Sequence, residues 1–100
     1  MFKVRIQPSA LEDVRRHFRY LKEHAHTPSY GDQWYDELQA AIASLRDFPF
    51  SCPLAPENDH FEEAIRHRLF GSYRVLFTVV NTEIHVLHVR HGRQDILEAE

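Results

Sequence analysis

The N-terminal residues alternate between apolar and polar before the period changes. The alternation runs from Phe2 to Ile6, as in a half-buried strand, and Pro8 ends it because proline has no N–H for a strand ladder. Ser9 and Glu12 then have the spacing of a capping box, in which the hydroxyl accepts from the backbone and the carboxylate reaches back. We therefore predict a short strand followed by a helix that begins at Ser9.

Two amphipathic helices are predicted next. In the first, apolar residues recur every three or four positions and share one face: Leu11, Val14, Phe18, Leu21 and Ala25. This helix should end near His26, because Thr27 precedes a proline and such residues disfavour helical backbone. The second helix, residues 29–47, has an apolar stripe made of Trp34, Leu38, Ala41, Ile42 and Leu45. A helical hairpin of this kind needs a flat surface on which to bury its apolar faces.

The rest of the chain is typical of an irregular connector followed by three strands. The connector, residues 48–63, contains three prolines. The strands are expected at residues 64–70, 73–80 and 83–91, with turns at Gly71–Ser72 and Asn81–Thr82. The order β-α-α-β-β-β predicts an α+β fold in which a small antiparallel sheet packs against the helical hairpin. We expect residues 1–100 to form a single domain.

The last two strands can be assigned a register. If Asn81–Thr82 is a two-residue hairpin loop, Val80 lies opposite Glu83, and the period of two places each side chain on a face. The more apolar face should pack on the helices: Tyr73, Val75, Phe77, Val79, Ile84, Val86 and His88. The other face is mixed: Arg74, Leu76, Thr78, Val80, Glu83, His85, Leu87, Val89 and His91. We therefore expect Arg74 and His91 to lie together on an open, ligand-facing side of the sheet, with Arg93 just beyond.

Charge is distributed unevenly along a chain whose formal net charge is −3. Residues 1–63 hold seven Lys or Arg and eleven Asp or Glu, whereas residues 64–93 hold five and one, and residues 94–100 hold none and three. The three net charges are thus −4, +4 and −3, so the predicted sheet is a basic island in an acidic protein. An anionic partner should meet this sheet, while the acidic helical half disfavours indiscriminate coating of nucleic acid.

The chain has neither a long apolar run nor an N-terminal apolar region of the kind that signal peptides carry. Its lone cysteine, Cys52, can form no internal disulfide, and we interpret it as a small loop residue rather than a nucleophile. We expect a cytoplasmic protein without a membrane partner. No phosphate loop or zinc-finger spacing is present, so we expect no cofactor.

Four ordered segments resemble a known family: Pro8–Asp13, Leu45–Pro49, Gly71–Phe77 and Val89–Asp95. With the initial strand, they make the chain similar to the RelE/ParE superfamily of bacterial type II toxins, and to its ParE-like plasmid stabilisation branch in particular. The resemblance implies a compact sheet with a helical hairpin. It also implies a toxin that a cognate antitoxin neutralises.

The superfamily contains two chemistries. ParE-like members resemble gyrase poisons, which are binding proteins, whereas RelE-like members cut mRNA on the ribosome, where basic side chains hold a phosphate that a ribose 2′-hydroxyl attacks. The positions that match the family's conserved arginines are Arg74 and Arg93. His91 could act as general acid or base in a nuclease, because histidine titrates near neutral pH.

Two departures from the nuclease pattern favour gyrase as the target. Arg66 and Arg68 stand where some nucleases carry a lysine pair, and a tyrosine that often follows the last strand is missing. We expect the target- or anion-binding surface to comprise Arg66, Arg68, Arg74, His91 and Arg93. The alternatives are a ribosome-dependent mRNA endoribonuclease that uses Arg74, His91 and Arg93, and an inactive homologue that only binds antitoxin.

Structural roles for the same residues stay open. Arg74 and Arg93 could pair with Asp95 or Glu83 on a solvated face. A metal site built from the strand histidines is disfavoured, because His85 and His91 would lie about 20 Å apart at roughly 3.3 Å per residue. We expect no metal.

Overall fold

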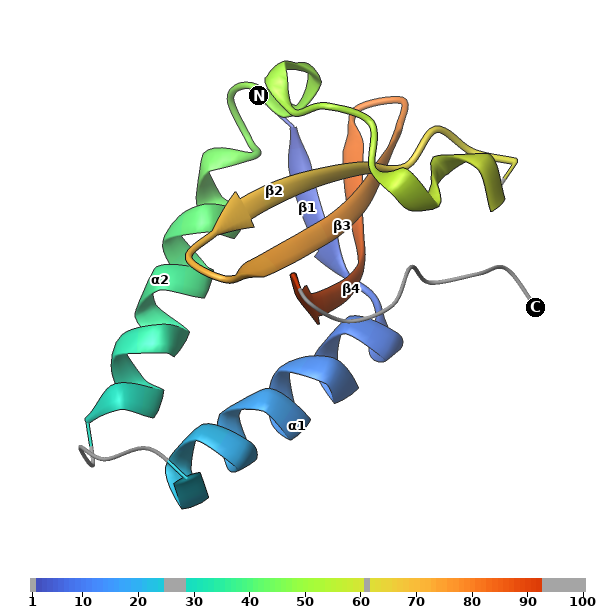
Figure 1. The fold of residues 1–100 in the computed structure, drawn as a ribbon. Coiled ribbons are helices and arrows are strands. Elements are labelled where there is room, and N and C mark those ends of the chain that lie inside the picture. Colours follow the sequence, from blue (N-terminus) through green and yellow to red (C-terminus); the bar gives the residue numbers. More distant parts are fainter. Residues whose placement is uncertain (1, 25–28, 61, 93–100) are drawn as a thin grey trace.

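The computed structural model describes residues 2–24, 29–60 and 62–92 (Figure 1). The elements are β1 (Lys3–Ile6), α1 (Pro8–His24), α2 (Tyr30–Ser44), the 3-10 helices η1 (Pro49–Ser51) and η2 (Pro56–His60), β2 (Arg66–Phe70), β3 (Tyr73–Val80) and β4 (Glu83–His91). The predicted order β-α-α-β-β-β is confirmed. The predicted end of the first helix near His26 lies outside the described residues.

The four strands form one sheet in the order β1-β4-β3-β2. β2 and β4 both run antiparallel to β3, as predicted, but β1 runs parallel to β4, with Val4 opposite Ile84. The prediction of a wholly antiparallel sheet is therefore wrong, and the sheet is mixed. A parallel pair needs a long connection between its strands, and here the two helices and two further strands separate β1 from β4.

The main core lies between the helices and one side of the sheet. The stripe of α2 is buried as predicted: Trp34, Leu38, Ala41, Ile42 and Leu45. These side chains meet apolar residues of β3 and β4, among them Phe77 and Ile84. The prediction for α1 holds only in part, because Leu21 is buried whereas Leu11 is exposed. Some apolar surface of α1 therefore stays accessible beside α2.

The start of α1 differs from the capping-box interpretation. Pro8 is the first helical residue, and the hydroxyl of Ser9 donates to the backbone carbonyl of Leu87 at 2.7 Å instead of accepting from its own helix. Glu12 is exposed and lies 4.0 Å from Arg15. The capping box is wrong because the hydroxyl of Ser9 is used by the neighbouring strand.

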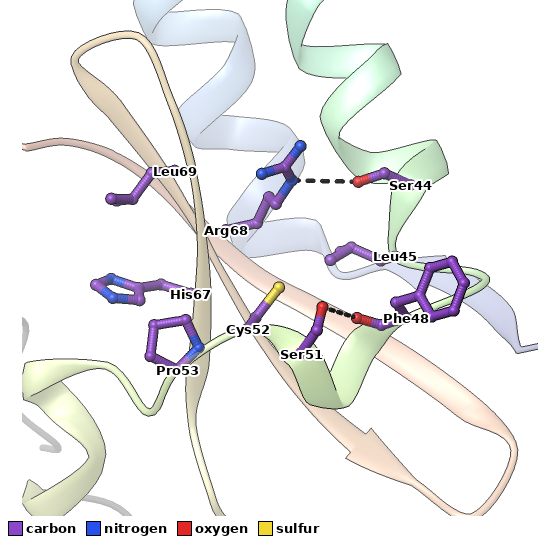
Figure 2. A pocket seen from close by; sticks show the side chains of 9 residues that line it. All are labelled: Ser44, Leu45, Phe48, Ser51, Cys52, Pro53, His67, Arg68 and Leu69. Atoms are coloured by element: carbon purple, nitrogen blue, oxygen red, sulfur yellow. Dashed lines mark hydrogen bonds between the residues drawn. The ribbon is translucent and has the colours of Figure 1, made fainter.

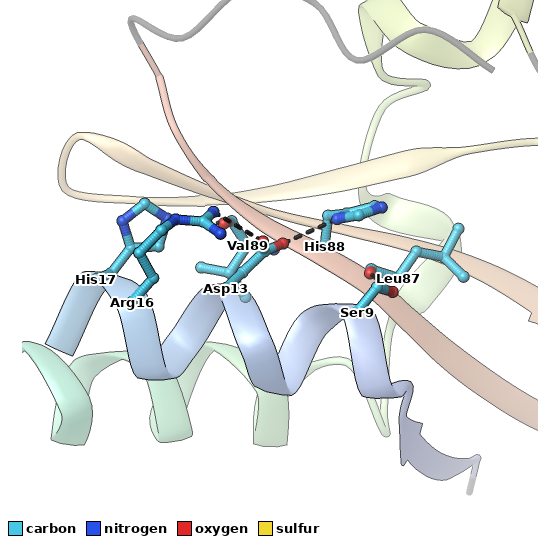
Figure 3. A network of polar contacts seen from close by, with 7 residues as sticks. All are labelled: Ser9, Asp13, Arg16, His17, Leu87, His88 and Val89. Carbon is cyan, nitrogen blue, oxygen red and sulfur yellow. Dashed lines mark hydrogen bonds and ion pairs between the residues drawn. The ribbon is translucent and has the colours of Figure 1, made fainter. Parts of the chain in front are cut away.

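Side chains of α1 take the place of a strand beside the end of β4 (Figure 3). Beyond the end of β1, the carbonyl of Leu87 accepts from Ser9, the amide of Val89 donates to Asp13 at 3.1 Å, and the carbonyl of Val89 accepts from His17 at 2.9 Å. Ser9, Asp13 and His17 follow one another at intervals of four residues and so share one face of the helix. They satisfy backbone groups that β1 is too short to reach.

The register of β3 and β4 shifts between Leu76 and Phe77. Val80 lies opposite Glu83, as predicted, but beyond the shift one residue of β4 is extra, as in a β-bulge. His91 therefore lies opposite Tyr73 on the side that faces the helices, while Arg74 lies on the other side, opposite Arg90. The expectation that Arg74 and His91 share a face is wrong, because a one-residue shift reverses every later side chain.

The other side of the sheet is partly covered rather than fully open. Residues 55–60 and 62–65 lie over it, and Ala55, Ile65 and Leu76 form a second small apolar cluster there. The hydroxyl of Thr78 donates to the carbonyl of Ala64 at 2.9 Å on the same side. The connector, which the three prolines had marked only as irregular, therefore covers the part of the predicted ligand-facing side around Arg74 and Leu76, while Val80 remains exposed.

Candidate interaction surfaces

The five residues of the predicted anion-binding surface do not converge. Arg66 and Arg68 lie opposite Phe77 and Val75, so both point to the helix side of the edge strand β2. Arg74 points to the covered side, and His91 lies on the helix side at the far end of β4. Arg93 lies outside the described residues. The structure thus separates the described basic residues into three environments.

Arg74 is a buried, fully engaged cation. Its guanidinium donates to both carboxylate oxygens of Glu57, at 2.8 and 2.6 Å, and its side chain lies 9% exposed beside a carboxylate that is 0% exposed. A third contact, at 3.3 Å, runs from Arg74 to Nδ1 of His67. Burial and then the charge of Arg74 hold the pKa of His67 below its usual value, so this ring is a neutral acceptor at neutral pH. The partner of Arg74 is therefore Glu57 of η2 rather than Glu83, and Asp95, the other suggested partner, lies outside the described residues.

His91 belongs to an aromatic cluster at the end of the sheet. Its ring lies 5.0 Å from that of Tyr73, which in turn lies 5.2 Å from His17 and 5.3 Å from Trp34. Burial lowers the pKa of His17 and raises the pKa of Tyr73. His17 and Tyr73 are therefore neutral at neutral pH, and the cluster packs α1 and α2 against β3.

Glu83 also has partners that the sequence did not suggest. Its carboxylate accepts from Arg5 at 2.7 Å and lies 3.1 Å from His85, across the β1–β4 pair. Hydrogen bonds from Arg5 and His85 hold the pKa of Glu83 below its usual value. Since Glu83 is at the other end of β4 from His91, this pair takes no part in the predicted basic surface.

Arg68 lines a hollow at the edge of β2 (Figure 2), and Arg66 lies two residues before it on the same strand. Arg68 donates to the hydroxyl of Ser44 at 3.2 Å, and Arg66 donates to the carbonyl of Cys52 at 2.7 Å while stacking over Phe50. The hollow has a volume of about 410 Å³. Its walls come from the end of α2, from the connector and from β2: Ser44, Leu45, Phe48, Ser51, Cys52, Pro53, His67, Arg68 and Leu69.

The sulfur of Cys52 points into this hollow (Figure 2). Burial raises the pKa of the thiol, and the nearby charges of Arg68 and Arg66 only partly oppose that effect. A thiol that stays protonated is a poor nucleophile. The geometry thus agrees with the interpretation of Cys52 as a small loop residue rather than a nucleophile.

A second hollow lies between the two helices. It measures about 530 Å³, and its walls are the outer faces of both helices: Leu11, Val14, Arg15, Phe18, Asp32, Tyr35 and Asp36. Its apolar floor is the part of α1 that the sheet does not cover. Asp32 is paired with Lys22 at 3.1 Å, so the charges on this rim are mixed and partly neutralised.

Asp13 is a structural residue that sequence reasoning did not single out, because it lies outside the predicted apolar face of the first helix. Its carboxylate is buried and accepts from Val89, His88 and Arg16, the last two at 2.8 and 2.9 Å (Figure 3). Burial alone would raise the pKa of Asp13, but these hydrogen bonds outweigh it and hold the pKa below its usual value. The i, i+4, i+8 spacing of Ser9, Asp13 and His17 was the available signal, since it sets polar groups in line on one helix face.

Within the described segments, no helix is both long and apolar enough to cross a membrane. No curated protein matches the sequence. Solved structures that share the fold include the following two. A chromosomal ParDE toxin–antitoxin system from P. aeruginosa aligns over 91% of this chain and 96% of that one, with a TM-score of 0.73 and 13% identity. The toxin–antitoxin complex RelBE2 from Mycobacterium tuberculosis aligns over 90% and 96%, with a TM-score of 0.57 and 21% identity.

The sequence itself matches a family model over residues 4–96. That model describes the ParE toxin of the type II toxin–antitoxin system parDE. Because the match spans nearly the whole chain, and the fold agrees with it, this chain belongs to the ParE toxin family of type II toxin–antitoxin systems.

Proposed function

We propose that this toxin acts by binding DNA gyrase rather than by cutting RNA. The observation that carries the proposal is the state of Arg74. A nuclease would need its guanidinium free to hold a phosphate beside His91, but Arg74 is buried against Glu57 and points to the opposite side of the sheet from His91. Replacing Glu57 by a phosphate would leave a buried carboxylate without its cation, which costs several kcal/mol.

We further propose that a cognate antitoxin neutralises the toxin. The two solved structures compared above are both toxin–antitoxin systems. A small toxin with uncovered apolar surface and uncompensated basic side chains suits an acidic, partly disordered segment that folds as it binds. The gene of such an antitoxin is expected beside the gene of this chain.

The two chemistries are separated by assaying both targets with the same purified chain. With gyrase and relaxed plasmid, we expect loss of supercoiling or accumulation of cleaved DNA, and in a translation reaction we expect the mRNA to stay intact. Cuts in translated mRNA at the ribosomal A site, with gyrase unaffected, would support the endoribonuclease instead.

Two variants sharpen the assay. In a nuclease, His91→Gln and Arg93→Lys should each lower the cutting rate by on the order of 10² to 10⁴, because proton transfer and the planar bidentate fork would be lost. In a binding protein, His91→Gln should change gyrase inhibition little, and loss of Arg93 should weaken it in a salt-dependent way. A chain that inhibits neither target yet binds its antitoxin would be the inactive homologue.

A further inference from the structure

Among the described residues, no strand pairs with the outer edge of β2 beyond its first residues. Outside it, the connector pairs with the start of β2: Ala55 donates to the carbonyl of Ile65 at 2.8 Å, and His67 donates to the carbonyl of Pro53 at 3.2 Å. Before Pro53, the chain turns away into η1. Backbone groups of a strand face the two edges alternately, so the N–H and C=O of Leu69 face outward like those of His67.

The hollow beside β2 lies where the connector leaves this edge. Figure 2 shows that its walls include side chains from both sides of β2, with Arg68 on one side and His67 and Leu69 on the other. The space therefore follows the backbone edge of β2 instead of opening on one face of the sheet. An extended peptide can add to such an edge through main-chain hydrogen bonds, with its side chains entering pockets on alternate sides.

The surroundings of this edge are apolar and positively charged. Phe48 is 72% exposed, Phe50 60%, Leu54 50% and Leu69 55%, and all four lie on the connector or on β2. Among the described residues, no carboxylate lies within ion-pair distance of Arg66 or Arg68, which contact only a carbonyl, a hydroxyl and an aromatic ring. Exposed aromatic side chains next to arginine are the composition of interface hot spots.

We propose that the β2 edge, defined by Phe48, Phe50, Leu54, Arg66, Arg68 and Leu69, docks an extended acidic segment of the antitoxin by strand addition. The segment pairs with the outward backbone groups of Leu69, places a carboxylate near Arg66 and Arg68, and sets apolar side chains against Phe48 and Leu69. This inference rests on the proposed antitoxin partnership and names one place on the toxin where the antitoxin binds.

The hollow between the helices fits this occupant less well. Its rim carries Asp32 and Asp36 with Arg15, so an acidic segment would meet like charge there, and no strand edge lies alongside it. A second copy of this chain is also a weaker candidate for the β2 edge, because the matching edge of the copy would bring the same two arginines against each other.

The test uses the full toxin co-purified with the product of the adjacent reading frame. The charge-reversed variant Arg66→Glu/Arg68→Glu should weaken the complex by on the order of 10- to 100-fold, and more strongly at low salt. Leu69→Pro should also weaken it, because proline removes the outward N–H while an edge strand tolerates proline. Arg15→Glu, on the rim of the hollow between the helices, is the matched control and should leave the affinity unchanged.

Amide hydrogen exchange in the wild-type complex provides a readout that does not depend on any variant folding. The amide of Leu69 should exchange more slowly once the antitoxin is bound. Unchanged exchange at Leu69, or variants that bind as tightly as the wild type, would overturn the proposal. Variants that keep the antitoxin but lose toxicity would assign the edge to the target instead. If the wild-type toxin does not bind the adjacent product at all, the antitoxin partnership itself fails.

Discussion

Arg74 and Arg68 lie on neighbouring strands, yet the protein uses them in opposite ways. Arg74 is buried and holds the carboxylate of Glu57 through two hydrogen bonds, so that it fastens the connector across the sheet. Arg68 is exposed and, among the described residues, forms a hydrogen bond with the hydroxyl of Ser44 and no ion pair. The family resemblance marked Arg74 as the working residue, but the structure leaves the uncompensated charge on β2. The sequence shows where basic residues gather along the chain. It does not show which of their charges are already neutralised by a buried partner.

The largest test of this comparison is to break the buried pair. Arg74→Met or Glu57→Leu alone should lower the free energy of unfolding by about 3–5 kcal/mol, because each leaves an uncompensated buried charge. Chemical denaturation measures the change. The double variant should recover much of the loss, since a buried pair replaced by apolar side chains of similar volume is often neutral.

The exposed Arg68 on β2 provides the control for that experiment. Arg68→Met should change the free energy of unfolding by less than about 0.5 kcal/mol, as is usual for an exposed side chain. If Arg68→Met were as destabilising as Arg74→Met, or if both pair variants were mild, the contrast between the two arginines would be lost.

Asp13 sharpens the comparison, because it is a second buried carboxylate whose partners include a backbone amide. Asp13→Ala should cost about 1–3 kcal/mol, the usual penalty for an unsatisfied buried donor, here the N–H of Val89. The same substitution should make hydrogen exchange at the amide of Val89 faster. Arg16→Ala removes only the exposed partner of the same carboxylate and should have a much smaller effect, which separates the backbone bond from the ion pair.

Sequence patterns anticipated these regions unequally. The α2 stripe from Trp34 to Leu45 and both hairpin turns follow from local periodicity and turn residues, and they are confirmed. The parallel pairing of β1 depends on which strand lies beside it in space, and alternation alone carries no such information. The element order was therefore predictable, while the sheet topology was only partly so.

The site was less predictable because two long-range features decide it. The register shift next to Leu76 cannot be seen in the sequence of β4, where apolar and polar residues still alternate. The prediction therefore assumed an uninterrupted register, and this placed His91 beside Arg74. Glu57 lies in a proline-rich stretch that has no period, and its partner is 17 residues away. Neither the register shift nor the position of Glu57 can be seen in the local sequence. The exposed position of Arg68 depends on β2 being an edge strand, and only the topology of the sheet shows that.

Histidine titration next to Arg74 offers a smaller test. The pKa of His67 lies below the usual 6.5, so as the pH falls below about 6.5 the unfolded chain takes up its proton first, and stability declines. The pKa of His17 is lowered too and adds a decline of the same sign. His67→Gln should flatten part of the pH dependence of the unfolding free energy, and His17→Gln another part. A rise in stability with acidification would contradict both pKa directions.

The smallest expected effect concerns Cys52, whose sulfur faces the hollow beside β2. Because burial raises the pKa of this thiol, alkylation of the folded protein near neutral pH should be slower than alkylation of the denatured chain, and it should quicken as the pH rises. Replacing Arg68 by Met removes a charge that favours the thiolate, so alkylation should slow further. Arg74→Met, read under conditions where it remains folded, is the matched comparison and should leave the rate unchanged, because Arg74 points to the other side of the sheet. Reaction rates followed by mass spectrometry decide it, and equal effects of the two arginine variants would contradict the separation of their environments.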